Sequence, residues 1–381
     1  MKTKILLAAT VDWPSVARYA NGFAASGCSV EVMTPEGSPA CISRYVDKCH
    51  AYDAFRPLSS LRRAIRDSGA ALIVACDDRV VRQLVRLYEK EAPSHSSIAQ
   101  LIEASLGQPK NYARLMSRNE SLASLREAGV RVPQTFAVAS EAELEAALER
   151  VGVPAVLKQD GSWGGEGVVI VRDRREAFRA YRRLSTPPSR LRSLYRAIKR
   201  RDPHHLVAAL VPPRWSVSVQ QFVEGTPAAS AFAAWKGEVV GSIYYDVLVA
   251  DREIGPPNVI RRVDCAEIDG ATKIVARTFG LSGLHGIDFI RDSSGAVHLI
   301  EVNPRATQGG TLAFGKNRDL PASLAAAIAP DITGMRKAIE SDIVVFFPRE
   351  WAKNPASPYL AIGHHDVPWD DPGVLKAALS F

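Results

Sequence analysis

The first hundred residues alternate between strand-length apolar segments and helical segments, and this alternation restricts the folds open to the chain. Residues 4–9, 30–33 and 71–75 are short apolar runs, and residues 14–25 have a helical pattern that ends before Gly27. Strands and helices that alternate at this spacing form an open, doubly wound sheet. The sequence therefore predicts an α/β unit at the N-terminus.

The turn after the first strand excludes one use of such a unit. The run Ala-Thr-Val-Asp-Trp-Pro at 9–14 lacks the glycines that let backbone approach a pyrophosphate. We therefore expect a Rossmann-like sheet without a dinucleotide site.

The rest of the chain mixes helices with hairpins. A chain of 381 residues is too long for one small core, and we expect two to four lobes. Helices are predicted over 98–127, 141–150 and 271–279, and strands over 135–138, 155–158, 168–171, 217–223, 229–234, 239–245, 286–290, 297–302 and 343–347.

A lysine and a glycine-rich loop follow the strand at 155–158. Lys158 precedes Gln-Asp-Gly-Ser-Trp-Gly-Gly-Glu-Gly, which ends at Gly167. Backbone N–H groups in such a loop can fold over a triphosphate, and the lysine can neutralise it. The loop is not of the Walker type, because no Gly-Lys-Ser/Thr follows. An ordinary glycine-rich hairpin is the alternative, so the motif is weak by itself.

Polar side chains end the predicted hairpin at 286–302. Asp288 lies on its first strand, and the second strand ends in Glu301-Val302-Asn303-Pro304-Arg305. The hairpin turn brings these oxygen-bearing side chains together, and such ligands suit Mg²⁺. Packing alone does not explain this ending on a strand rich in Ile and Val. The alternative is a salt bridge between Glu301 and Arg305.

A third segment, Gln220-Gln221-Phe222-Val223-Glu224-Gly225, connects two lobes. The order of the three pieces resembles the ATP-grasp superfamily over roughly 118–310, and Glu-x-Asn-Pro-Arg is its most specific element. The resemblance implies a Rossmann-like pre-ATP-grasp domain at 1–117, an α+β first lobe with a glycine-rich lid at 118–219, a second lobe with the metal site at 220–335, and a C-terminal extension at 336–381.

The resemblance also implies a role for each matching residue. Lys158 and Arg118 are expected to contact phosphate. The lid over the phosphates would comprise Gly161, Ser162, Gly164, Gly165 and Gly167. The adenine hinge comprises Gln220, Gln221 and Val223, and the metal ligands are Asp288, Glu301 and Asn303. Arg305 matches a basic residue that steadies an acyl phosphate. The chain departs from the family at the hinge, where Gln replaces a usual Glu, and near Pro227, where many members place a ribose-binding carboxylate; Glu224 is a possible substitute.

The activity implied is that of an ATP- and Mg²⁺-dependent ligase, with Mn²⁺ as an alternative metal. It would activate a small-molecule carboxylate as an acyl phosphate and join it to an amine. The rivals are a bicarbonate-phosphorylating enzyme, without a visible biotin-carrier segment, and a regulatory module that only binds nucleotide.

The basic stretch at 172–201 carries twelve Lys or Arg and two acidic residues. A solvated helical face is the expected reading, because no aromatic interleaving supports nucleic-acid binding. A patch that binds RNA or an acidic substrate is the alternative. Nucleic acid is therefore not expected as a partner, and neither is a membrane, because no apolar run approaches the roughly 20 residues of a membrane helix. A homodimer is possible. The formal charge of +7 suits an anionic ligand such as a nucleotide.

The remaining observations concern location and the C-terminus. Five scattered cysteines without a CxxC pair predict neither a zinc site nor a disulfide framework, and favour the cytoplasm. The run Ile-Leu-Leu-Ala-Ala after Lys4 is read as a strand, not as a signal peptide. His364-His365-Asp366 and Asp370-Asp371 are expected in a polar surface turn, with a metal site as the alternative.

Overall fold

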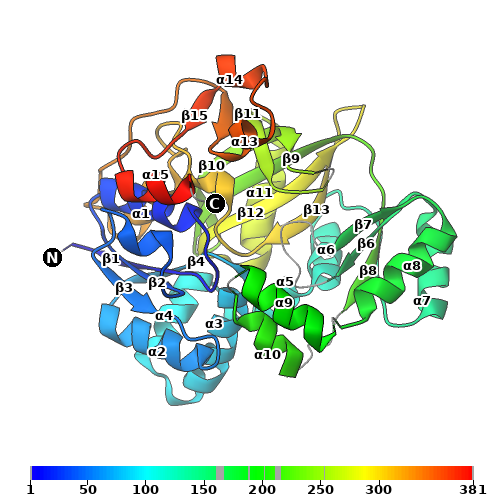
Figure 1. The fold of residues 1–381 in the computed structure, drawn as a ribbon, viewed down its shortest axis with the longest axis horizontal. Helices are drawn as coiled ribbons and strands as arrows, with labels where there is room; N and C mark the ends of the chain where they lie inside the picture. The colour runs from blue at the N-terminus through cyan, green and yellow to red at the C-terminus, as the bar shows by residue number, and fades with distance from the viewer. Residues whose placement is uncertain are drawn as a thin grey trace.

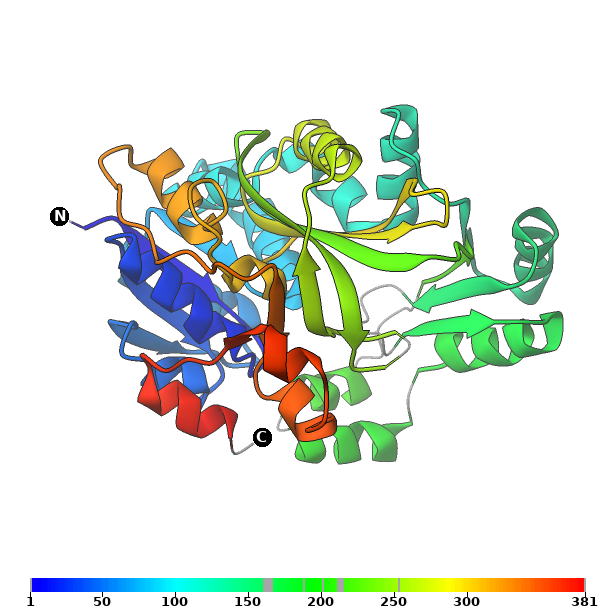
Figure 2. The ribbon, with the colours of Figure 1, turned by 90° about the horizontal axis from the view of Figure 1, so that it is seen from above.

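Three sheets organise the computed structural model, which describes residues 2–159, 167–187, 189–200, 202–210, 216–252 and 254–379 (Figure 1). The N-terminal sheet and the smallest sheet lie at opposite ends, with the largest sheet between them (Figure 2). Within these ranges no helix is long and apolar enough to cross a membrane.

The N-terminal sheet is parallel, with strand order β3-β2-β1-β4. Alternate residues of β1 pack into cores on opposite faces, Ile5 and Leu7 into one and Leu6 and Ala8 into the other. A parallel sheet covered on both faces requires such an apolar strand, and the predicted doubly wound unit is confirmed. Its elements are β1 (Lys4–Ala8), α1 (Ser15–Ala25), β2 (Ser29–Thr34), η1 (Pro39–Ile42), β3 (Lys48–Ala51), α2 (Pro57–Ser68), β4 (Leu72–Ala75), α3 (Asp78–Glu91), η2 (Ala92–Ser94) and α4 (Ser97–Leu106).

The helical segment predicted over 98–127 is divided into several pieces. It breaks at Gly107, whose φ is +97° and whose backbone lies so close to Gly280 that a Cβ would sit 2.0 Å from the Gly280 carbonyl oxygen. A positive φ ends a right-handed helix, and only glycine fits here, because a side chain would collide with the large lobe. The pieces that follow are η3 (Pro109–Asn111), α5 (Tyr112–Met116) and α6 (Arg118–Glu127).

The smallest sheet has order β5-β8-β6-β7, and its described pairings are antiparallel. Its apolar side chains pack with Leu144, Leu148, Ala177 and Tyr181 of two helices. The elements are β5 (Thr135–Val138), α7 (Glu141–Val151), β6 (Ala155–Gln159), β7 (Val168–Val171), α8 (Arg174–Ser185) and β8 (Val217–Gln221). The helix predicted over 141–150 and the strands predicted over 135–138, 155–158 and 168–171 are confirmed, whereas the strand predicted over 217–223 ends at Gln221.

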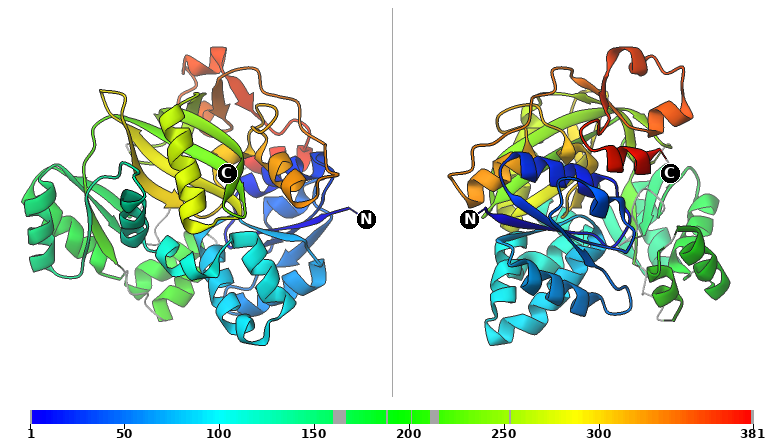
Figure 3. Two further views of the ribbon diagram at one scale, coloured as in Figure 1. Left: turned by 180° about the vertical axis from the view of Figure 1, so that it is seen from behind. Right: turned by 60° about the vertical axis from the view of Figure 1, so that its left-hand side comes forward.

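The largest sheet has order β13-β12-β9-β10-β11-β14-β15. Strand β9 alternates: Ala229, Ala231 and Ala233 face α1 and α12, whereas Phe232 faces α11. Helix α11 thus covers one face, as Figure 3 shows from behind, while α12 and the N-terminal unit cover the other. The elements are β9 (Thr226–Trp235), β10 (Glu238–Ala250), β11 (Pro257–Arg262), α11 (Ala266–Phe279), β12 (Gly283–Arg291), β13 (Val297–Asn303), η4 (Gln308–Thr311) and α12 (Leu320–Ile328).

The C-terminal segment completes this sheet instead of forming a separate polar turn. It comprises β14 (Ile343–Phe346), α13 (Arg349–Lys353), α14 (Tyr359–Ile362), β15 (His364–Asp366) and α15 (Pro372–Ala378). Because β15 pairs in parallel with β14, the turn expected at 364–366 is wrong. Asp366 forms an ion pair with Arg18 of α1, which fixes the segment against the N-terminal unit (Figure 3).

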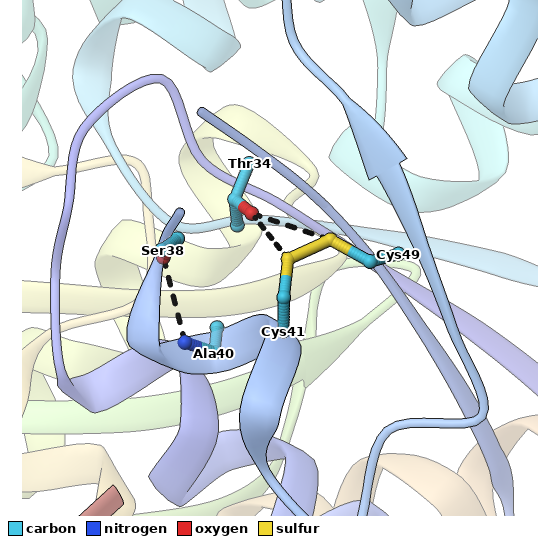
Figure 4. The surroundings of a disulfide bond; sticks show 5 residues. All are labelled: Thr34, Ser38, Ala40, Cys41 and Cys49. Atoms are coloured by element: carbon cyan, nitrogen blue, oxygen red, sulfur yellow. Dashed lines mark hydrogen bonds between the residues drawn. A yellow bond between two sulfur atoms is a disulfide. The ribbon is translucent and has the colours of Figure 1, made fainter. Parts of the chain in front are cut away.

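A disulfide joins Cys41 and Cys49, and this corrects the expectation of no disulfide (Figure 4). The two cysteines are eight positions apart in the sequence, but η1 and β3 bring their Cα atoms to 5.5 Å. The Thr34 hydroxyl lies 3.3 Å and 3.7 Å from the two sulfurs. The spacing of the cysteines in the sequence does not reveal this proximity. Because a disulfide is present, the cysteine pattern no longer supports a reducing compartment.

An insertion of two helices, α9 (Arg190–Arg200) and α10 (His204–Leu210), links the small lobe to the N-terminal unit. Arg79 of α3 donates a 2.7 Å hydrogen bond to Asp202, which precedes α10. The His204 ring stacks on Tyr52 at 5.6 Å, with Nε2 2.7 Å from the tyrosine hydroxyl. The insertion therefore bridges the two units.

This bridge should weaken in acid. Burial, then the nearby Arg79, lowers the pKa of His204 to about 4, so the folded chain takes up this proton less readily than the unfolded chain. The contact stabilises the fold fully at a pH above the ordinary histidine pKa of about 6.5. About 1–2 kcal/mol of this stability is lost as the pH falls to about 4. The difference in melting temperature between wild type and His204→Phe should shrink over this range. A constant difference would contradict the account.

Candidate active site

The strand pair β12–β13 places two carboxylates side by side. Asp288 of β12 is directly opposite Glu301 of β13, and Gly286 is opposite Asn303. The register shifts between Asp288 and Phe289, because Phe289 pairs with Leu299. Ile300 is consequently the extra residue of a β-bulge, and its carbonyl oxygen is available to other groups.

Two side chains of the small lobe use this carbonyl. Lys158 of β6 and Gln220 of β8 are almost fully buried, and Lys158 Nζ and Gln220 Nε2 each donate to the Ile300 oxygen at 3.3 Å. Gln220 also donates to Thr135 Oγ1 at 3.1 Å. The small lobe therefore joins the large sheet directly beside the two carboxylates.

Arg118 approaches the carboxylates from the start of α6. The Ser117 side chain caps this helix by accepting a hydrogen bond from the Glu120 backbone N–H, and so fixes the start of the helix at Arg118. Arg118 Nη2 donates to Glu301 Oε1 at 2.7 Å. The Glu301–Arg305 salt bridge considered from the sequence is not the ion pair formed, because Glu301 pairs with Arg118.

Arg305 connects the carboxylates to the N-terminal unit. Its Nε donates to Asp78 Oδ2 at 2.9 Å, at the first turn of α3, and its Nη2 donates to Asn303 Oδ1 at 3.2 Å. Asn303 Nδ2 in turn donates to Asp288 Oδ2 at 2.9 Å. The backbone N–H of Ala306 donates to the Ala75 carbonyl at 2.9 Å. The end of β13 is thus fixed against the carboxyl edge of the parallel sheet.

Burial and neighbouring charges shift the pKa values of the two carboxylates in opposite directions. Burial, then the neighbouring Glu301, raises the pKa of Asp288 to about 6. Burial also acts to raise the pKa of Glu301, but Arg118 and Lys158 hold it below its usual value. Burial opposes the charge of Arg305, yet Asp78 raises the pKa of this guanidinium. The site therefore combines one carboxylate whose ionisation burial disfavours, Asp288, with a second carboxylate held ionised by neighbouring cations.

Comparisons with known proteins identify the fold. No protein-family model matches the sequence, and no curated protein matches it. The biotin carboxylase domain dimer of 2-oxoglutarate carboxylase from Hydrogenobacter thermophilus, with MgADP, ADP and bicarbonate, has a TM-score of 0.62 at 15% identity, over 89% of this chain and 72% of that chain. N5-carboxyaminoimidazole synthetase from Staphylococcus aureus, with ADP, has a TM-score of 0.62 at 15% identity, over 91% and 81%.

An L-amino acid ligase from Bacillus licheniformis has a TM-score of 0.59 at 15% identity, over 90% of this chain and 79% of that chain. The chain has the ATP-grasp fold. At this identity the likeness covers the architecture alone, and the chemistry must be argued from the side chains.

Within this ATP-grasp fold, the structure gathers most of the described candidate residues. Lys158, Gln220, Asp288, Glu301 and Asn303 are linked by the contacts above, as are Arg118 and Arg305. Gln221 is exposed and its Oε1 accepts from the Gln134 backbone at 3.3 Å, while Val223 is half-buried. Gly167 accepts a 2.8 Å bond from the Gln159 backbone. The lid residues Gly161, Ser162, Gly164 and Gly165 lie outside the described residues.

Sequence reasoning missed the contribution of Asp78 and of two tyrosines. Asp78 follows a buried strand, and this position at a strand end was the available signal. Tyr19 of α1 donates to the Thr307 carbonyl at 2.5 Å, and Tyr245 of β10 packs against Gly309. Burial, then Asp288, raises the pKa of Tyr245 and keeps it neutral. No sequence pattern marked either tyrosine, because both belong to apolar segments.

The Gly309→Ala variant tests the packing behind the site. A Cβ at Gly309 would lie 2.4 Å from Tyr245 Cε1, so η4 or the buried ring must move. We expect a loss of about 1–3 kcal/mol in unfolding free energy, measured by denaturant titration, together with weaker turnover. Gly295→Ala is not a suitable control, because its φ is +87°; Gly270→Ala is, since its Cβ meets open space. Equal stability of the Gly309 and Gly270 variants would contradict the packing.

Proposed function

We propose that this chain is an ATP- and Mg²⁺-dependent ligase that activates a carboxylate as an acyl phosphate and joins it to an amine. The observation that carries the proposal is the meeting of Lys158, Arg118 and Arg305 with Asp288, Glu301 and Asn303 where three parts of the fold converge. A purely structural ion-pair cluster does not require two buried carboxylates opposite each other, as Asp288 and Glu301 are.

The residue types suit the chemistry. A substrate carboxylate and the γ-phosphate of ATP are both anions, so cations must offset their repulsion. Lys158 and Arg118 would bind phosphate oxygens, and Arg305, positioned by Asp78, would hold the acyl group. The carboxylate oxygen attacks the γ-phosphorus and ADP leaves. The amine then attacks the acyl carbon and loses a proton. Phosphate leaves and carries away the carboxylate oxygen that attacked the γ-phosphorus.

The metal-ligand proposal rests on the donor set. Asp288, Glu301 and Asn303 supply carboxylate and amide oxygens, the ligand type that Mg²⁺ prefers, and a divalent cation would favour the charged form of Asp288 that burial disfavours. When bound by these residues, Mg²⁺ would supply positive charge that offsets the charge of the phosphates. Mn²⁺ would fit the same oxygens.

Bicarbonate is the second candidate for the activated acid. One structural neighbour was solved with MgADP and bicarbonate, and its chain has the same overall fold. The proposed phosphate-binding residues serve either acid, so the two functions differ in the acceptor. A cytoplasmic location, where ATP is supplied, and a homodimer, as in that neighbour, are further proposals.

The test is release of ADP and phosphate from ATP and Mg²⁺ with a panel of amino acids and small carboxylates, each with and without bicarbonate. We expect release that depends on one acid and one amine. Release that requires bicarbonate instead would replace the ligase by the second candidate. ATP binding without release across the panel would contradict both and leave a nucleotide-binding module.

A further inference from the structure

Helix α9 presents its large apolar side chains to solvent. The exposed fractions are 81% for Leu191, 46% for Leu194, 62% for Tyr195 and 71% for Ile198. This spacing of three and four residues places them in one stripe along the helix. Small residues face inward instead: Ser193 is 1% exposed. The helix is therefore oriented with its apolar side outward, the reverse of an ordinary surface helix.

Cations border this stripe. Arg192 and Lys199 are exposed on one side of it and Arg190 on the other, and the Lys199 ammonium lies 5.7 Å from the centre of the Tyr195 ring. Between Glu176 and Asp202 the sequence has no Asp or Glu. Association with a second copy would place cations against cations, so the charge favours an anionic partner.

Two large apolar side chains of the C-terminal segment are also exposed. Ile362 is 62% exposed and Trp369, between β15 and α15, is 70% exposed. Figure 2 shows α9 and α15 along one edge of the molecule, and Figure 1 shows both on the side facing the viewer. An exposed helix whose apolar stripe is bordered by cations suits an anionic lipid surface, where the apolar side chains and the cations meet different layers.

We propose that this side of the protein binds the surface of an anionic lipid bilayer, with α9 lying in the headgroup region. The stripe defined by Leu191, Leu194, Tyr195 and Ile198 enters the boundary with the acyl chains, and Arg190, Arg192 and Lys199 contact lipid phosphates. The contact is peripheral and reversible, and it is independent of the ligase activity. It differs from the sequence expectation of no membrane partner.

The test is sedimentation of the full chain with vesicles of equal parts phosphatidylcholine and phosphatidylglycerol, compared with phosphatidylcholine alone. We expect binding to the anionic vesicles only, weakened by salt. The double variant Leu191→Ser/Ile198→Ser should bind about tenfold or more weakly, and Arg192→Gln/Lys199→Gln should bind less at low salt. These exposed positions should leave melting temperature unchanged.

Phe55→Ser is the matched control, because Phe55 is an exposed apolar residue, at 62%, of the N-terminal unit. It should bind like wild type. Absence of binding to the anionic vesicles would overturn the proposal, as would equal binding by the stripe variant. Displacement of the protein from vesicles by single-stranded RNA, with tighter binding to RNA itself, would assign the basic helix to nucleic acid and also overturn it.

Discussion

The Glu301→Gln variant should lose ATP-dependent turnover by about a thousandfold or more while the chain stays folded. Glutamine keeps the shape of the side chain and can still accept the hydrogen bond from Arg118 Nη2. The negative charge is lost, however, and with it a proposed metal ligand opposite Asp288. Turnover is measured as ADP release, and folding as the melting temperature.

Glu238→Gln is the matched control for this variant. Glu238 forms an exposed pair with Arg277 at the far end of β10, so its loss should change neither turnover nor stability appreciably. A magnesium titration tests whether the loss of turnover is the loss of a metal ligand. If it is, the Glu301 variant should need far more Mg²⁺ for its residual activity. Unchanged turnover in Glu301→Gln would remove the metal assignment.

The Lys158→Met variant should lower turnover by about a hundredfold to a thousandfold and raise the KM for ATP. Methionine replaces the buried aliphatic stem but not the ammonium, which is the group proposed to contact phosphate. The Ile300 carbonyl keeps its second donor, Gln220 Nε2 at 3.3 Å, so this acceptor stays paired. The effect should therefore be chemical and not structural.

Lys316→Met, at an exposed position, is the control for loss of a positive charge. Direct measurement of ATP binding decides what Lys158 does. Weak ATP binding with Mg²⁺ present would place the residue on the bound nucleotide, whereas unchanged binding and unchanged turnover would mean that Lys158 only joins the two lobes through Ile300.

The sequence was sufficient for the elements that depend on local pattern. Asp288 and Glu301 could be paired in advance, because one short turn between two apolar strands leaves few registers. The bulge at Ile300 could not be anticipated, since an extra residue in a strand does not change its apolar character. The Lys158 and Gln220 contacts to that carbonyl depend on the bulge and were hidden for the same reason.

Contacts between distant parts of the chain were the other gap. Arg305 and Asp78 are 227 residues apart, and only the packing of two lobes brings them together. The Cys41–Cys49 disulfide depends likewise on how η1 leads into β3. The outward direction of the apolar stripe on α9 is a tertiary property, because an amphipathic pattern does not show which face is covered.

The most direct test of the central claim follows oxygen. A carboxylate substrate found in the panel would be labelled with heavy oxygen, and the phosphate released in the presence of ATP and amine would be analysed by mass spectrometry. The account predicts one labelled oxygen transferred from the carboxylate to each phosphate, because the acyl phosphate forms through that atom. Unlabelled phosphate at full turnover would contradict it.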